Sequence, residues 1–357
     1  MLGWERFSRM VCATLGVIKT RRTLAFAFLL LAIPGFLVGA TVSYISWGLK
    51  PAGGGKTIEF AIPEGATTSW VAAKLYQNKI IRNPTLFRFY ARSHDLDKRI
   101  ATGTYKVSSE LSVPEILRRL TSGEQVTKRF TIPEGLTVKE IAARLERQNI
   151  ASGQAFLHEL QNGEFGYTFL PRDLVGPARF EGYLFPDTYQ VFPDVSVHAV
   201  IEGMLRRFAT VSQELNLAAE AAKQGLTAHQ AVTLASLVER EAKRSEERAL
   251  IAGVLYNRLR KGMPLQVDAT VQYALGEHRE RILYEDLTVD SPYNTYRVTG
   301  LPPGPIAAPG RASLLAVIRP AETDYLYYVA KPDGSHAFSR TLAEHNANKG
   351  RYQSNPE

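Results

Sequence analysis

The chain has 357 residues, 45% of them hydrophobic and 22% charged, a composition that excludes wholesale disorder and allows about two domains with sizeable cores. Its single cysteine, Cys12, excludes an intrachain disulfide framework and a cysteine-based zinc cluster. Half of the net charge of +8 lies in the first 23 residues and no basic-aromatic run follows, so we expect no nucleic-acid partner.

An uncharged apolar segment lies near the N-terminus, between Thr23 and Leu49. It is long enough for a tilted helix that spans a bilayer, and Tyr44 and Trp47 lie where interfacial aromatics are usual. Basic residues precede it and few follow, which predicts that the N-terminus is inside the cell and the rest of the chain outside. The small residues 38–40 leave a cleaved signal peptide as the alternative. The expected parts are a cytoplasmic basic tail (1–23), a transmembrane anchor (24–49) and a flexible linker (50–56).

An internal repeat follows the linker. The pattern Ile-Pro-Glu-Gly-x-Thr occurs twice, 70 residues apart, and each copy continues as an amphipathic helix that Thr67 or Thr137 would cap. The repeat predicts a duplicated α/β module, with one copy within 57–128 and a second at about 128–151. These strand–turn–helix units resemble LysM-like modules, which bind glycans that contain N-acetylglucosamine. A purely structural role for each copy remains open.

Two adjacent helices are predicted in the second half of the chain. The first begins with a capping box of Thr227 and Gln230, and the second begins at Ser245. The buried face of the first helix is expected to comprise Ala231, Leu234, Ala235, Val238 and Ala242. Glu239 and Glu241 fall on opposite flanks of that face. A half-buried carboxylate has the raised pKa of a general acid, whereas the alternative is two solvated charges at a helix edge.

Polar and aromatic side chains that suit sugar hydroxyls follow the helix pair. The candidate sugar ligands are Gln266, Asp268, Tyr273, Tyr293 and Asn294. An earlier segment, Phe180–Tyr189, is dense in aromatic residues, which suits either a sugar face or a loop packed on a core. The histidines lack metal-motif spacing, and no phosphate or dinucleotide motif occurs, so we expect neither a metal nor a cofactor. Residues 325–339 are predicted to form a β-hairpin, and Thr341 and Glu344 to cap a last helix.

Four blocks of sequence resemble the YceG-like (MltG) family of membrane-anchored endolytic peptidoglycan transglycosylases. They are Leu234–Ala242, Asn257–Leu275, Ser291–Gly310, and the residues DYLYYV and HAFSRTLAEHN near the C-terminus. The resemblance implies an α+β fold with an N-terminal transmembrane helix, a LysM-like module, and a catalytic region over 129–353 with a helix-borne glutamate. It also implies a single-pass protein of the inner membrane whose periplasmic domain acts on nascent peptidoglycan glycan strands, near cell-wall synthases.

The resemblance implies that Glu239 is the catalytic acid. Small side chains on its flank, such as Ser236, leave room for a substrate, whereas the flank of Glu241 carries leucines. The expected reaction cleaves the bond from N-acetylmuramic acid to N-acetylglucosamine and leaves 1,6-anhydro ends. Two alternatives are a lysozyme-like hydrolase, with Asp268 as its second carboxylate, and a glycan-binding scaffold without catalysis.

Overall fold

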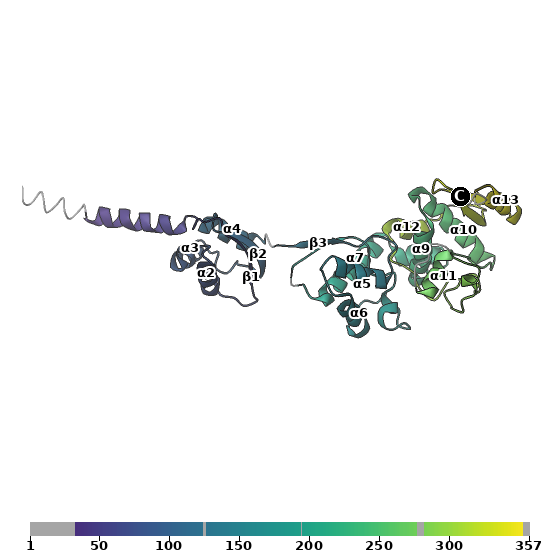
Figure 1. The fold of residues 1–357 in the computed structure, drawn as a ribbon, viewed down its shortest axis with the longest axis horizontal. Coiled ribbons are helices and arrows are strands. Elements are labelled where there is room, and N and C mark those ends of the chain that lie inside the picture. The colour runs from purple at the N-terminus through teal and green to yellow at the C-terminus, as the bar shows by residue number, and fades with distance from the viewer. Residues whose placement is uncertain (1–32, 124–125, 194, 277–281, 353–357) are drawn as a thin grey trace, which may run out of the picture. The chain divides into compact units, whose positions relative to one another are not determined.

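The chain forms two compact units, Met1–Val126 and Thr127–Glu357, each with its own hydrophobic core. The computed structural model describes residues 33–123, 126–193, 195–276 and 282–352 (Figure 1). The expected basic tail lies outside the described residues, as does the start of the expected anchor. Helices and strands occur in both units, so the predicted α+β class is confirmed.

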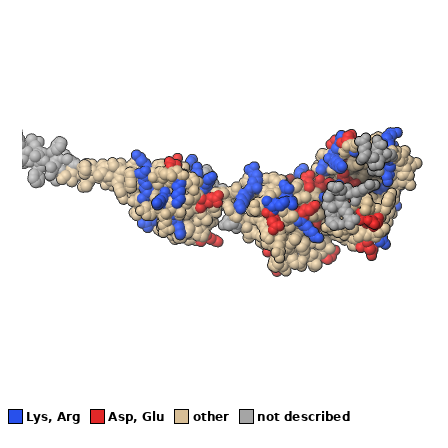
Figure 2. Space-filling model, in the orientation of Figure 1, with Lys and Arg blue, Asp and Glu red and all other residues tan. Residues whose placement is uncertain are grey.

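The first unit is a two-stranded sheet covered by helices. Strand β1 (Thr57–Ile62) pairs antiparallel with β2 (Gly103–Ser108), and Thr57 lies opposite Ser108. Helices α2 (Thr68–Gln77), α3 (Pro84–Ser93) and α4 (Val113–Ser122) complete the unit. Its core includes Phe60, Leu75, Phe87, Tyr105 and Leu117, all buried. Lys and Arg side chains are spread over the visible face of this unit (Figure 2).

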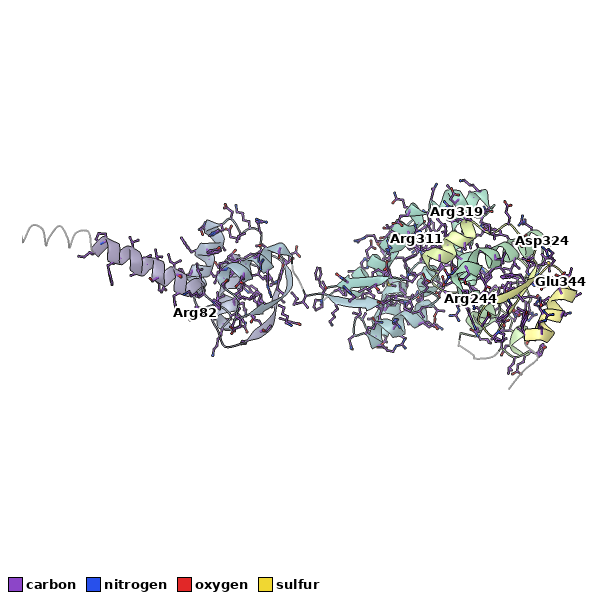
Figure 3. The ribbon with its side chains drawn as sticks, turned by 90° about the horizontal axis from the view of Figure 1, so that it is seen from above. Arg82, Arg244, Arg311, Arg319, Asp324 and Glu344 are labelled. Carbon is purple, nitrogen blue, oxygen red and sulfur yellow. The ribbon has the colours of Figure 1, made fainter. Side chains whose placement is uncertain are left out.

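A helix formed by residues 33–49 is joined to the first unit at its C-terminal end. The Arg82 guanidinium lies 5.3 Å from the centre of the Trp47 ring, and its Nε donates to the Pro51 carbonyl at 2.8 Å (Figure 3). The Asn83 amide donates to the Tyr44 hydroxyl at 2.9 Å. Among the described residues, no helix is both long and apolar enough to cross a bilayer.

The second unit begins with the same order of elements. Strand β3 (Lys128–Thr131) pairs antiparallel with β4 (Thr188–Val191), and α5 (Val138–Arg147) and α6 (Gly153–Asn162) lie between them in sequence. The remaining elements, which are mostly helical, are η1 (Gly176–Phe180), α7 (Val197–Glu214), α8 (Leu217–Lys223), α9 (Ala228–Glu241), η2 (Ser245–Glu247), α10 (Arg248–Arg260), α11 (Asp268–Leu275), η3 (Asp286–Thr288), α12 (Arg311–Ile318), β5 (Tyr327–Ala330), β6 (His336–Ser339) and α13 (Leu342–Tyr352). The predicted hairpin and last helix are confirmed.

The internal repeat is a structural duplication that extends beyond the sequence pattern. Both Pro-Glu-Gly turns place their glycine in the left-handed region, Gly65 at φ +76° and Gly135 at φ +79°. Thr67 and Thr137 cap the following helices, as predicted. Each copy continues through a second helix to a return strand. The connection to that strand spans residues 94–102 in the first copy and 163–187 in the second, so the second copy carries a longer insertion.

Helix α9 is the centre of the second unit. Its predicted capping box is present, because the Gln230 side chain accepts from Thr227 N–H at 2.9 Å and the Thr227 hydroxyl accepts from Gln230 N–H at 3.2 Å. The predicted face is buried, but every residue from Ala231 to Val238 is buried as well. Helices α10, α11 and α12 all pack against α9. The helix is therefore surrounded by protein rather than half-exposed, so its flanks are not open surfaces.

The left-handed turn of the second copy predicts a matched pair of glycine substitutions. Gly135→Ala should lower the free energy of unfolding of the second unit by about 1–2 kcal/mol, because an L-residue is strained at this φ. Gly203→Ala, within α7 and with no atom near its added Cβ, should raise it by about 0.5–1 kcal/mol. Denaturant unfolding of both variants measures the difference. Equal effects would contradict the assigned backbone conformation.

Candidate functional site

The C-terminal end of α9 carries three consecutive charged residues with separate partners. The first, Glu239, has a side chain that is only 5% exposed. Arg248 Nη2 donates to its Oε1 at 3.2 Å, and Gly310 N–H donates to its Oε2 at 2.9 Å. Arg248 also lies 3.8 Å from Glu134, whose carboxyl has a raised pKa because of burial and the nearby charge of Glu239. Both oxygens of Glu239 therefore already accept hydrogen bonds from the protein.

The flank of Glu239 is filled rather than open. Ser236 is fully buried, and its hydroxyl accepts from the backbone N–H of Ile306 at 3.0 Å. The loop that contains Ile306 continues to Gly310, which contacts Glu239. The prediction that small residues here leave room for substrate is wrong, because helix periodicity cannot show that a loop 70 residues later packs on this flank.

The third charged residue, Glu241, has the properties of a proton donor. The residue is partly exposed, but protein atoms enclose its carboxyl group, and this burial raises its pKa to about 7. The nearby Asp268 raises the pKa further, whereas the Tyr328 hydroxyl, which donates to Oε2 at 2.9 Å, opposes the shift. A carboxyl group with a pKa near neutrality can hold a proton and give it up under the same conditions.

Two of the predicted sugar ligands, Gln266 and Asp268, belong to the group of side chains around Glu241. Tyr296 donates to Asp268 Oδ1 at 2.5 Å. Gln266 has φ +53°, in the left-handed region, and its side chain accepts from Arg258 Nη1 at 3.4 Å. Arg258 itself is held by carbonyl oxygens, including that of Leu265 at 2.7 Å. We define the acid cluster as Glu241, Gln266, Asp268, Tyr296 and Tyr328, with Arg258 behind it. The sequence placed Gln266 and Asp268 near the acid but missed the two tyrosines.

Another predicted ligand, Tyr273, lines a cavity of about 460 Å³, and Tyr293 packs against its ring. The rings of Tyr273 and Tyr293 are 4.8 Å apart, and the Tyr273 hydroxyl donates to Glu181 Oε2 at 3.3 Å. Glu181 comes from the aromatic segment of the second-copy insertion, and the sequence pattern alone did not predict it as a site residue. Burial raises its pKa to about 8. Helix α11 joins the two groups, because Asp268 at its start belongs to the acid cluster and Tyr273 on its next turn lines the cavity.

Asn294 does not belong to either group. It is fully buried, and its amide donates to the carbonyl oxygens of Leu287 at 2.9 Å and Val289 at 2.8 Å. Its oxygen accepts from Tyr296 N–H at 3.1 Å. The prediction that Asn294 binds substrate is therefore wrong, since its polar atoms are used to fix the loop that presents the neighbouring tyrosines.

Arg240, between the two glutamates, connects the cavity to the repeat. It donates to the Gly135 carbonyl at 3.0 Å and to the Gln272 side chain at 3.4 Å. Gly135 N–H donates to the Ala308 carbonyl at 2.8 Å, so the second Pro-Glu-Gly turn is built into the site. Within the described ranges, no cluster of three or more His, Cys, Asp or Glu side chains is arranged to hold a metal ion.

The fold and the site together define an α+β protein with acid–base chemistry. The site combines a neutral carboxyl group, a second carboxylate, phenol groups and an adjoining cavity. These are the groups that an enzyme needs to protonate a glycosidic oxygen. The YceG-like family model matches residues 60–351, and the chain belongs to this family.

Several relatives are similar over most of this chain. An endolytic murein transglycosylase of Bacillus subtilis (strain 168) is 38% identical over 311 residues, covering 83% of this chain and 85% of the relative. One of Streptococcus pneumoniae (strain ATCC BAA-255 / R6) is 32% identical over 322 residues, covering 82% of this chain and 58% of the relative. A crystal structure of a YceG-like protein from Listeria monocytogenes matches with a TM-score of 0.57 and 35% identity, covering 83% of this chain and all of the other.

The raised pKa of Glu241 predicts a pH dependence of stability. The folded state holds the proton more tightly than the unfolded state, whose ordinary pKa is 4.5, so the stabilisation is complete below that value and is lost as the pH rises through about 7. Between these values the wild type should lose about 1.4 kcal/mol per pH unit more than Glu241→Gln. Denaturant unfolding of the second unit from pH 5 to pH 8 measures both slopes. Parallel slopes would contradict the shift.

Proposed function

We propose that this protein is a lytic transglycosylase that cleaves peptidoglycan glycan strands internally, between N-acetylmuramic acid and N-acetylglucosamine. Membership of the YceG-like family and the names of the curated relatives support this activity. The structural observation that supports this activity most directly is the enclosed carboxyl group of Glu241. This group can be neutral near pH 7 while a second carboxylate, Asp268, lies close by. Glycosidic bond cleavage requires such a proton donor.

We propose Glu241 as the proton donor, in place of the expected Glu239. Glu239 accepts hydrogen bonds at both oxygens, from Arg248 and from Gly310, so both oxygens are occupied by donors of the protein itself. Its role is to hold Arg248 and the loop at Gly310 in place. Among the described residues, the side chain of Glu241 accepts one hydrogen bond, from Tyr328, and its enclosed carboxyl group favours the protonated form.

The reaction needs one carboxyl group that acts first in its protonated form and then in its ionised form. Glu241 donates its proton to the glycosidic oxygen as the bond to C1 of N-acetylmuramic acid breaks. The resulting carboxylate then takes the proton of the C6 hydroxyl of the same sugar while that oxygen bonds to C1. This restores the neutral Glu241 and leaves a 1,6-anhydro end without consuming water. The Asp268 carboxylate, held by Tyr296, would stabilise positive charge that develops at C1.

We further propose that the helix of residues 33–49 belongs to a single membrane anchor, with the catalytic unit outside the cytoplasmic membrane. Its exposed apolar side chains, including Phe36, Leu37 and Val42, and the interfacial position of Tyr44 and Trp47 support this. The repeated strand–turn–helix order supports LysM-like modules that contact glycan. This location would bring the enzyme to nascent strands near cell-wall synthases.

The two glutamates of α9 give a matched pair of variants. Glu241→Gln should lower the rate of cleavage by about 10²–10⁴-fold, the usual contribution of a general acid. Glu239→Gln should lower it much less, because it weakens the pairing with Arg248 without removing the proton donor. Initial rates on purified sacculi, with the fold of each variant checked by circular dichroism, measure both losses. The reverse order of losses would restore Glu239 as the acid.

The carboxylate of Asp268 beside Glu241 also favours a second candidate, a hydrolase of the lysozyme kind. Mass spectrometry of the digest distinguishes the two, because anhydro ends are lighter than reducing ends by one water molecule. We expect anhydro ends from both the wild type and the slower Asp268→Asn variant. Reducing ends in the wild-type digest would reject the transglycosylase mechanism, and no cleavage by either protein would favour a glycan-binding scaffold.

A further inference from the structure

The hydroxyl group that contacts Glu241 is carried by a small hairpin. Tyr328 lies in β5, and the sheet that β5 forms with β6 has two strands within the described part of the chain. A two-stranded hairpin is at best marginally stable in water by itself. The position of the hairpin, and with it that of the Tyr328 hydroxyl, must therefore be fixed by contacts with the rest of the second unit.

The last turn of α10 holds the segment that leads into the hairpin. The Asn257 amide donates to the carbonyl oxygens of Thr323 at 2.8 Å and Tyr325 at 2.9 Å. Arg258 Nε donates to the Leu326 carbonyl at 2.7 Å. All three carbonyls precede β5, so these contacts fix the chain where it enters the hairpin but do not fix the turn at the other end.

The turn of the hairpin is held by a carboxyl group at the start of α10. Glu247, the residue before that helix, accepts from His336 N–H at 3.0 Å, and its other oxygen lies 2.7 Å from His336 Nδ1. Both side chains are enclosed, since that of Glu247 is 14% exposed and that of His336 is 5% exposed. A second contact at this end, from Arg244 to the Asp333 carbonyl at 2.9 Å, is exposed. The pair of Glu247 and His336 is thus the enclosed contact that fixes the turn.

His336 also contacts Tyr328 directly. It pairs with Ala330 across the hairpin, and Ala330 follows Tyr328 by two positions, so the His336 and Tyr328 side chains are diagonal neighbours on the same face. Their rings meet edge to face, with centroids 5.4 Å apart and an angle of 86° between the planes. A continuous series of contacts therefore links Glu247 to the proposed proton donor, through His336 and Tyr328.

We propose that His336 and Glu247 are positioning residues, which hold the Tyr328 ring so that its hydroxyl stays hydrogen-bonded to the proton donor. The inference rests on the proposed function, in which that donor is Glu241. The hydrogen bond from Tyr328 to Oε2 fixes the orientation of the carboxyl group, and a general acid must be aligned with the oxygen that it protonates. His336 acts through the tyrosine, because its side chain is too enclosed to contact a glycan strand.

Substitution of His336 should change the chemical step rather than the binding of glycan. In His336→Ala the turn loses Glu247 and the Tyr328 ring loses its edge contact, so kcat on purified sacculi, at the pH optimum of each protein, should fall by about 10–10²-fold with the apparent KM unchanged. The Tyr328 hydrogen bond opposes the raised pKa of Glu241, so its loss should raise that pKa further. The alkaline limb of the pH profile should then move to higher pH, because a general acid is active while it is protonated.

The other charged and titratable groups around Glu241 come from α9 and three further segments. They are Arg240 on α9, Arg258 on α10, Asp268 on α11 and Tyr296 in the loop after η3. All of them remain in His336→Ala, so a shift of the alkaline limb in this variant reports on the Tyr328 contact.

Three further variants separate positioning from a general effect on stability. Tyr328→Phe should give the same fall in kcat and the same shift of the limb, and the double variant with His336→Ala should be no worse than the worse single variant. Glu247→Gln keeps an acceptor for His336 N–H and should show a smaller shift in the same direction. Asp324→Asn removes an exposed ion pair with Arg340, 2.6 Å long and flanking the same hairpin, and should leave kcat and the profile unchanged (Figure 3).

The positioning role is rejected if His336→Ala lowers the free energy of unfolding but keeps the kcat and the pH profile of the wild type. It is also rejected if the losses of His336→Ala and Tyr328→Phe multiply in the double variant, because independent losses show that neither residue acts through the other. If His336→Ala does not fold, Glu247→Gln takes its place, and an unshifted limb in that variant rejects the role.

Carbon-13 NMR of the Glu241 carboxyl separates this inference from the proposed function, because it needs no turnover. A higher titration midpoint in both His336→Ala and Tyr328→Phe, in a protein that cleaves no glycan, would reject the activity and keep the link from His336 to Glu241. Cleavage by the wild type, with the Glu241 midpoint unchanged in His336→Ala, would keep the activity and reject the positioning role.

Discussion

The whole site depends on how the end of α9 is enclosed. Three consecutive residues there have different partners: Glu239 binds Arg248 and Gly310, Arg240 binds the Gly135 carbonyl, and Glu241 accepts from Tyr328. These partners come from a helix, a repeat turn, a loop and a hairpin that are distant in sequence. Because each contact uses a different segment, the end of α9 is where the second unit is assembled as well as where its acid is placed.

This enclosure gives different surroundings to two chemically identical carboxyl groups, those of Glu239 and Glu241. Arg248 and Gly310 donate to the two oxygens of Glu239, whereas burial beside Asp268 favours the proton on Glu241. The duplicated module contributes directly, since its second Pro-Glu-Gly turn supplies Glu134 beside Arg248 and Gly135 beneath Arg240. The longer insertion of that copy supplies Glu181. The first copy of the module thus belongs to a separate small unit, whereas the second copy forms one wall of the site.

Local patterns predicted what depends on neighbours in sequence. The capping box of α9, both Thr caps of the repeat and the C-terminal hairpin follow from residues a few positions apart. The choice between Glu239 and Glu241 could not be made in this way, because it depends on Gly310 and Tyr328, 71 and 87 positions away. Asn294 differs from its prediction for a related reason: its residue type suits sugar binding, but its polar atoms form hydrogen bonds within its own buried loop.

As the proton donor, Glu241 has to hold a proton near neutral pH while the protein is folded. Carbon-13 NMR of the side-chain carboxyl of Glu241, assigned with the Glu241→Gln variant and followed from pH 4 to pH 9 in the full-length chain, measures this directly. We expect a titration midpoint of about 7. A midpoint near the ordinary value of 4.5 would mean that Glu241 is ionised at neutral pH, and would contradict its role as the acid.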